Sequence, residues 1–210
     1  MQPSLLDTLV SILASSVGSL TSPAKIFKTY ESSGEKELSI NTIHSYLSHL
    51  EDAFIVEKSK RYNINNIKGK KYIQSPHKYY FTDIGLRNAC LNFRQQEESH
   101  LMENLIYNEL IICGYNVDVG LIELRENNKR KQTEVDFICN QGSKRYYIQV
   151  ALNLDTKEKT AQESRSLNQI DDNFKKIIIG KDAPKHWLTE DGILVLGIFE
   201  FLLNPNSLDL

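Results

Sequence analysis

Apolar residues recur every three or four positions in three stretches near the start of the chain, which predicts three short amphipathic helices. The first, SLLDTLVSILASSVGSL, begins with a Ser-x-x-Asp cap and ends near Gly18. The second has Ser22 as its cap, Pro23 as its first helical residue and Gly34 past its end. The third is capped at Ser39 or Asn41. Its expected inward residues are Ile43, Leu47, Leu50 and Phe54.

Two strands are predicted after these helices, at residues 55–62 and 71–74, with the Asn- and Gly-rich NINNIKGK between them as a hairpin loop. Three helices followed by a hairpin predict a winged helix-turn-helix domain over residues 1–92. The run Tyr79-Tyr80-Phe81 either stacks on bases or forms a buried strand, and we favour the strand, with Asp83 capping the next helix.

The predicted wing is rich in positive charge, and a winged helix often binds double-stranded DNA with its third helix in the major groove and its wing along phosphates. The candidate nucleic-acid-binding residues are Lys58, Lys60, Arg61, Lys68, Lys70 and Lys71, with Lys78 also in this region and only Glu57 opposing them. The third helix offers no bidentate reading of guanine, because its exposed positions carry no Arg or Lys. These positions include Asn41, Thr42, His44, Ser45, Ser48 and His49. The alternative is a solvated wing on a domain that mainly packs against its neighbours.

The second part of the chain, residues 93–210, opens with an apolar helix expected to be capped near Ser99 and closed by Gly114. At about 100° per residue, Glu103 lies on the same face as Ile106, Tyr107 and Leu110. A carboxylate on an apolar face needs a partner. Either Glu103 belongs to a site, or it is held in a structural salt bridge or hydrogen bond.

Period-two alternation predicts a three-stranded meander after this helix, from NVDVGLIELRENN, QTEVDFIC and YYIQVALNL. The alternation places Glu134 and Asp136 on one face of their strand, with Val135 and Phe137 on the other. Gln149 and Ala151 share a face of the next strand. A polar helix from residue 155, the strand KKIIIG and the strand-to-helix stretch DGILVLGIFEFLL complete an α/β domain with a mixed sheet.

Composition and charge change this picture in a few respects. The 210 residues are 40% hydrophobic and 25% charged, as in globular proteins, and contain no apolar run long enough to span a membrane. The net charge of −2 divides into +3 for residues 1–93 and −5 for residues 94–210. The N-terminus lacks the features of a signal peptide. Cys90, Cys113 and Cys139 are odd in number and widely spaced, which predicts buried thiols in a reducing cytoplasm.

A helix carrying Glu, a strand carrying Asp and a strand carrying Glu-x-Lys form the layout that the second part resembles, that of the PD-(D/E)XK nuclease superfamily. In such a site carboxylates hold Mg²⁺ and the lysine orients water. Glu103 and Asp136 take the first two roles and are the residues that would hold a metal, while Gln149 and Ala151 replace the last acid and the lysine. We therefore assign no catalytic residue, treat Glu103, Asp136 and Gln149 as vestigial candidates, and expect no cofactor beyond weakly held Mg²⁺. A substitute lysine, Lys157 or Lys159, is the alternative.

The chain as a whole resembles the C-terminal part of a bacterial and archaeal family of AAA-type ATPases, in which a P-loop domain precedes a winged helix and a PD-(D/E)XK-like domain. The resemblance covers nearly all of the chain. It is most specific in KYYFTDIGLRNA and in the series ENLIYNEL, TEVDFI and YIQVA, whose order and spacing match together. No GxxxxGK[ST] motif is present, so we expect no ATP binding and a fragment that lacks its ATPase domain.

The resemblance implies a non-catalytic accessory region, whose partners are double-stranded DNA and the missing ATPase domain. A weak Mg²⁺-dependent DNA endonuclease and a winged-helix transcription regulator are the two alternatives.

Overall fold

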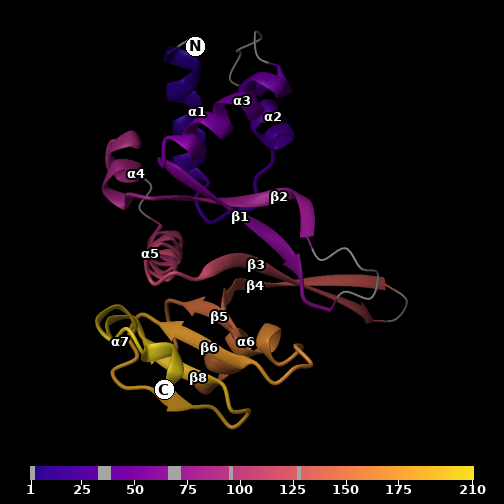
Figure 1. The fold of residues 1–210 in the computed structure, drawn as a ribbon, viewed down its shortest axis with the longest axis vertical. Coiled ribbons are helices and arrows are strands. Elements are labelled where there is room, and N and C mark those ends of the chain that lie inside the picture. The colour runs from indigo at the N-terminus through magenta and orange to yellow at the C-terminus, as the bar shows by residue number, and fades with distance from the viewer. Residues whose placement is uncertain (1–2, 33–38, 66–71, 95–96, 127–128) are drawn as a thin grey trace. The chain divides into compact units, whose positions relative to one another are not determined.

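The computed structural model describes residues 3–32, 39–65, 72–94, 97–126 and 129–210, and it is a mixed α/β structure (Figure 1). The helices are α1 (Pro3–Ser15), α2 (Pro23–Ser32), α3 (Ile40–Asp52), α4 (Ile84–Cys90), α5 (Glu98–Ile112), α6 (Lys157–Leu167), α7 (Ile198–Leu203) and a 3-10 turn (Ser207–Asp209). The strands are β1 (Val56–Asn63), β2 (Tyr72–Phe81), β3 (Asn116–Glu126), β4 (Lys129–Gln141), β5 (Lys144–Ala151), β6 (Lys175–Gly180), β7 (Trp187–Leu188) and β8 (Leu194–Gly197).

Within the described residues the strands follow the order β2-β1-β3-β4-β5-β6-β8-β7 in one sheet. The β3–β4 and β4–β5 pairs are antiparallel, whereas β1–β3, β5–β6 and β6–β8 are parallel. The expected mixed sheet is therefore confirmed. The chain divides into two compact units, residues 1–60 with 74–104 and residues 61–73 with 105–210, and each is described by itself below.

The first unit contains the three predicted N-terminal helices, and side-chain caps explain where α2 and α3 begin. The predicted cap of the first helix is wrong, because α1 begins at Pro3 and Ser4 lies inside it. The Ser22 side chain accepts a hydrogen bond from the Lys25 amide at 3.2 Å, and the Ser39 side chain accepts one from the Thr42 amide at 3.1 Å. Gly18, with φ +71°, follows α1 in a conformation that favours glycine. The buried residues of these helices include Leu9, Leu13, Ile26, Tyr30, Ile43, Leu47 and Leu50.

Phe54 was expected to point inward, and this expectation is wrong. Its side chain is 73% exposed and its φ is +54°, because α3 ends at Asp52 and the chain turns there toward β1. The helical period therefore stops applying before residue 54. This leaves a bare aromatic ring on the surface of the first unit.

Strand β2 is longer than the predicted strand and contains the buried run Tyr79-Tyr80-Phe81, which confirms the structural interpretation of that run. Its His77 is bridged to Thr21 by reciprocal backbone hydrogen bonds of 2.7 and 2.9 Å. Asp83 caps α4 by accepting a hydrogen bond from the Leu86 amide at 2.8 Å, as predicted. On α4, the buried Arg87 donates to the Ala14 carbonyl at 2.8 Å and so ties this helix to the end of α1.

The second unit is built around the sheet from the end of β1 to β7. One buried cluster includes Val135, Ile138, Tyr147, Ile178 and Val195 from the strands, together with Leu167 of α6. Parallel strands need a crossover, and α6 supplies it between β5 and β6.

A β-bulge in β4 changes the expected alternation. Asp118 pairs with Ile138 and Gly120 with Val135, so β4 contains one extra residue over this interval. Val135 and Ile138 consequently join the same cluster, while the Phe137 ring lies 6.0 Å from the ring of Tyr107 on α5. The expectation that Val135 and Phe137 share a face is therefore wrong.

Three further expectations need correction. Helix α5 begins at Glu98 rather than after a cap at Ser99. The short strand β7 pairs antiparallel with β8 and had no counterpart in the sequence interpretation.

All three cysteines are free thiols, but only Cys139 is buried and Cys113 is exposed. Burial raises the pKa of the Cys139 thiol well above its usual value. No helix in the described part of the chain is long and apolar enough to cross a membrane.

Candidate functional site

Glu103 occupies an almost buried position on α5 and is bound by two neighbours of its own unit. Its Oε1 atom accepts a hydrogen bond from Lys78 Nζ at 2.9 Å and one from the Tyr80 hydroxyl at 2.6 Å. The side chains of Lys78 and Glu103 are only 4% and 12% exposed. This is the structural salt bridge that the sequence left as one of two roles for Glu103.

The next residue, Asn104, reinforces the contact between α5 and β2. Its side-chain amide donates to the Phe81 carbonyl at 2.8 Å, and its side-chain oxygen accepts from the Phe81 amide at 2.9 Å. Glu103 and Asn104 therefore attach α5 to Lys78, Tyr80 and Phe81 near the end of β2. The local arrangement explains both side chains as parts of the first unit.

Asp136 lies in the second unit, where β4 and β5 separate. The last paired residues are Phe137 and Ile148, and the Asp136 carboxylate accepts a hydrogen bond of 2.8 Å from the Val150 amide beyond them. A side chain here replaces the missing strand partner of that amide. Asp136 thus satisfies a backbone donor.

Gln149 and Ala151 share the face of β5 that packs on α6. Gln149 Oε1 accepts a hydrogen bond of 3.2 Å from the Ser166 hydroxyl. Ala151 is buried in the cluster described above, and the neighbouring Leu154 lies partly buried against that cluster. The position where a nuclease would carry its lysine is therefore part of an apolar core.

The alternative to the missing lysine was a substitute lysine at the start of α6, Lys157 or Lys159. Lys157 and Lys159 are both exposed, and Lys159 Nζ lies 3.2 Å from Asp155 in an ion pair on its own helix turn. Among the described residues, no group of three or more His, Cys, Asp or Glu side chains is placed to hold a metal ion. Glu103 belongs to the first unit, and Asp136 and Gln149 belong to the second.

The basic residues predicted to bind DNA have different surroundings. Lys58 Nζ donates to both oxygens of Glu51, at 2.7 and 3.0 Å. Lys60 is exposed, whereas Arg61 is only 8% exposed. The remaining candidates, Lys68, Lys70 and Lys71, lie outside the described residues.

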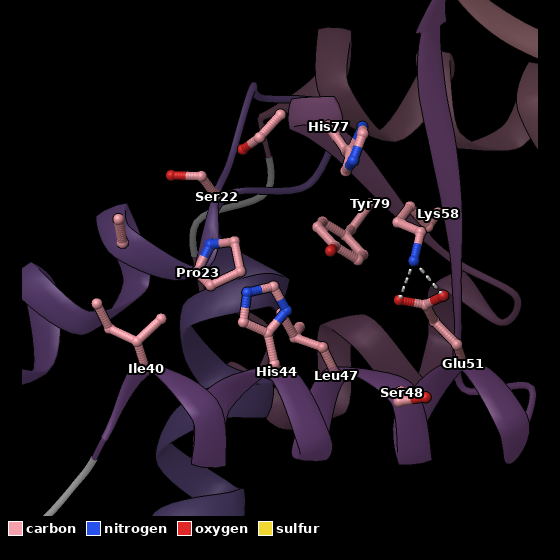
Figure 2. Close-up of a pocket in the computed structure, with 12 residues that line it drawn as sticks. Ser22, Pro23, Ile40, His44, Leu47, Ser48, Glu51, Lys58, His77 and Tyr79 are labelled. Carbon is pink, nitrogen blue, oxygen red and sulfur yellow. Dashed lines mark hydrogen bonds and ion pairs between the residues drawn. The ribbon is translucent and has the colours of Figure 1, made fainter. Parts of the chain in front are cut away.

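A pocket of about 550 Å³ lies in the first unit, between α3 and the strands (Figure 2). Its polar lining includes His44, Ser48 and Glu51 from α3, spaced so that they share one face of the helix. Strand residues Lys58, His77 and Tyr79 face them, and Pro23, Ala24, Ile40 and Leu47 contribute apolar surface. In Figure 2 the Glu51–Lys58 ion pair lies at one end of this pocket and Pro23 at the other.

Tyr79 is the buried polar residue of this pocket. The residue is 4% exposed, and its hydroxyl makes no hydrogen bond to any described residue. Burial, and then the negative charge of Glu51, raise the pKa of Tyr79 well above its usual value. The phenol therefore stays protonated near neutral pH and can donate a hydrogen bond into the pocket.

Sequence reasoning missed this pocket. It interpreted His44 and Ser48 as exposed positions of the third helix, which both are, and Lys58 as part of a basic wing, but it did not bring them together. The pocket joins residues of α3 to residues of β2 more than twenty positions later, so no periodicity or local motif signals it. Only the pairing of Glu51 with Lys58, seven positions apart, lies within one stretch of sequence.

Comparisons with known proteins give two family matches. Residues 1–97 match the family model of a domain of unknown function (DUF8612), and residues 98–201 match that of another domain of unknown function (DUF4143). A Haemophilus influenzae protein described as "Uncharacterized protein" is 34% identical over 200 residues. The match covers 95% of this chain and 46% of that protein, so the chain spans about half of its relative's length.

Among solved structures, the crystal structure of protein VC1899 from Vibrio cholerae is similar at 12% identity, over 99% of this chain and 56% of that chain. The TM-score is 0.37, which does not indicate a common fold.

Proposed function

We propose that this chain is a non-catalytic accessory region of an AAA-type ATPase, in which a winged helix contacts double-stranded DNA and a degenerate PD-(D/E)XK-like domain serves binding or assembly. The ATPase connection rests on the sequence resemblance of KYYFTDIGLRNA and the ENLIYNEL, TEVDFI and YIQVA series.

The observation that supports the absence of catalysis is the environment of residue 151. A metal-dependent nuclease needs a cation beside its metal to orient the attacking water. Ala151 supplies none, and it packs in an apolar cluster that would exclude a charged side chain. Glu103 is already neutralised by Lys78, so it has no spare negative charge for Mg²⁺.

The order of elements in the first unit supports the winged-helix part of the proposal. Three helices precede two strands, and the strand residue His77 is bridged to Thr21, which lies between α1 and α2. This is the arrangement expected when a short strand joins the hairpin of a wing. Winged helices bind DNA through the third helix and the wing.

Lys58 and Lys60 provide a matched pair for testing the DNA contact, because they lie two residues apart on the same face of β1. Lys60 is exposed, whereas the charge of Lys58 is compensated by Glu51. We expect Lys60→Ala to lower the slope of log K against log salt for a mixed-sequence duplex by about 0.9, the value for one lost phosphate contact. Lys58→Ala should change that slope much less.

The measurement is fluorescence anisotropy with a labelled duplex at several salt concentrations. Equal slopes for the wild type, Lys60→Ala and Lys58→Ala would contradict a phosphate contact along β1. A duplex that does not bind at low salt would contradict the DNA-binding part of the proposal and leave assembly as the role. Preference for one operator-like sequence over others would instead favour a transcription regulator.

A further inference from the structure

We propose that the pocket between α3 and the strands of the first unit binds a nucleobase that presents an N–H group beside a carbonyl, as guanine does. This site includes Lys58, whose charge is paired with Glu51, but not Lys60, and the proposal does not depend on whether Lys60 contacts duplex DNA. The argument rests on the size of the pocket, on the Glu51–Lys58 pair and on the surrounding rings.

The size of the pocket suits a small planar molecule. Its volume of about 550 Å³ lies within the range of small-molecule sites, roughly 300–1,000 Å³. Apolar lining comes from Leu47, Ile40 and Pro23, and ring side chains come from His44, His77 and Tyr79. Figure 2 shows His77 and Tyr79 on the strand side and His44 rising from α3 opposite them. Unpaired bases stack on accessible aromatic and histidine rings, which here are His44 and His77, because Tyr79 is only 4% exposed.

The Glu51–Lys58 pair offers an acceptor and a donor side by side. Lys58 Nζ has three protons and uses two on the Glu51 oxygens, so one remains for a ligand. Each Glu51 oxygen keeps a lone pair. The two side chains are 25% and 30% exposed, which leaves both within reach of a bound molecule. An edge with N–H next to C=O can donate to the carboxylate and accept from the ammonium group.

Net charge favours a base over a simple anion. The carboxylate of Glu51 cancels the charge of Lys58 and would repel a phosphate or a carboxylate placed beside it. The protonated Tyr79 hydroxyl adds a neutral donor that has no partner among the described residues. A neutral heterocycle with both donors and acceptors satisfies all three groups.

Calorimetric titration of the 210-residue chain with guanosine and with adenosine tests this proposal. Adenosine is the matched control because its edge has an amino group beside a ring nitrogen and lacks the N–H and carbonyl pair. We expect guanosine to bind at least about tenfold more tightly, since hydrogen bonds to charged groups are the stronger ones. Equal affinities, or no heat with millimolar guanosine, would overturn the proposal.

Variants locate the binding to the pocket. Tyr79→Phe removes one hydroxyl and keeps the ring, and Glu51→Gln removes the anionic acceptor. Each should weaken guanosine binding by about tenfold, while Tyr46→Phe, which removes a hydroxyl of α3 outside the pocket lining, should not. Thermal unfolding of each variant identifies loss of the fold. If folded Tyr79→Phe and Glu51→Gln bind guanosine as the wild type does, the site is elsewhere and the proposal fails.

The same chemistry has two sources, a free nucleoside or an unpaired base in a nucleic acid. A single-stranded adenine oligonucleotide with one central guanine separates them. If this oligonucleotide binds more tightly than guanosine, and the all-adenine oligonucleotide does not, the ligand is an unpaired base in a nucleic acid. Equal affinity for the oligonucleotide and for guanosine identifies the nucleoside.

Discussion

Replacing Glu103 with leucine removes the carboxylate that compensates the charge of Lys78 and accepts a hydrogen bond from the Tyr80 hydroxyl. The side chain of Lys78 is 4% exposed, and it would then be a buried cation that has lost its ion pair with Glu103. Breaking a buried ion pair in this way typically costs about 3–5 kcal/mol. If Glu103 were instead kept as a metal ligand of an active site, its removal would leave stability unchanged or improve it.

The assay is thermal and urea-induced unfolding of the full chain. For a chain of this size about 1 kcal/mol corresponds to roughly 2–4 °C, so Glu103→Leu should lower Tm by about 6–20 °C. Glu97→Gln is the matched control near the start of the same helix. Its carboxylate is 70% exposed and contacts His100 at 3.1 Å. An exposed pair of this kind contributes at most about 1 kcal/mol.

The double variant Glu103→Leu/Lys78→Met separates the ion pair from packing. Replacing both partners by apolar residues is often neutral or stabilising, so the double variant should recover at least about 2 kcal/mol relative to Glu103→Leu alone. The reasoning is refuted if Glu103→Leu unfolds with the wild-type midpoint. It is also refuted if adding Lys78→Met to Glu103→Leu lowers the free energy of unfolding by about 3–5 kcal/mol more, as much as Glu103→Leu does alone.

Three further predictions follow from single positions. Ala151→Lys should lower the free energy of unfolding by at least about 2 kcal/mol, because it forces a charged chain into an apolar cluster, and the folded fraction should not cleave plasmid. Gly18→Ala should cost about 1–2 kcal/mol because of its left-handed φ, measured by urea unfolding. Hydrogen bonds from Lys144 and Tyr146 hold the pKa of Asp209 below its usual value. A lowered folded pKa gives stability that is present above the unfolded pKa of about 3.9 and is lost as pH falls through the folded pKa. Asp209→Asn should therefore flatten the acid limb of Tm measured from pH 5 to 2, and an unchanged acid limb would contradict this role of Asp209.

The local features of the fold were accessible from the sequence. Capping by Ser22, Ser39 and Asp83 depends on interactions three residues apart, and each hydrogen bond is present. Buried residues on α3 followed from helical spacing as far as the helix continued. The prediction that Phe54 points inward was wrong because the helical spacing was extended beyond Asp52, where the backbone leaves the helix.

The surroundings of the candidate site residues depend on contacts between residues far apart in the sequence, and residue spacing does not specify such contacts. Glu103 was correctly expected to need a partner, but nothing in the sequence identified Lys78, 25 positions earlier. The bulge in β4 moved Phe137 away from the face of Val135, because one extra residue reverses the alternation. Lys58 was assigned to a basic wing from its sequence neighbours, while its charge is compensated by Glu51 on α3.

The central claim, that the proposed accessory region does not cleave DNA, is tested most directly by incubating supercoiled plasmid with the chain and millimolar Mn²⁺ or Mg²⁺. We predict no nicking above a protein-free control, and no difference between the wild type and Asp136→Ala. Metal-dependent nicking by the wild type that Asp136→Ala abolishes would contradict the account and identify an active endonuclease.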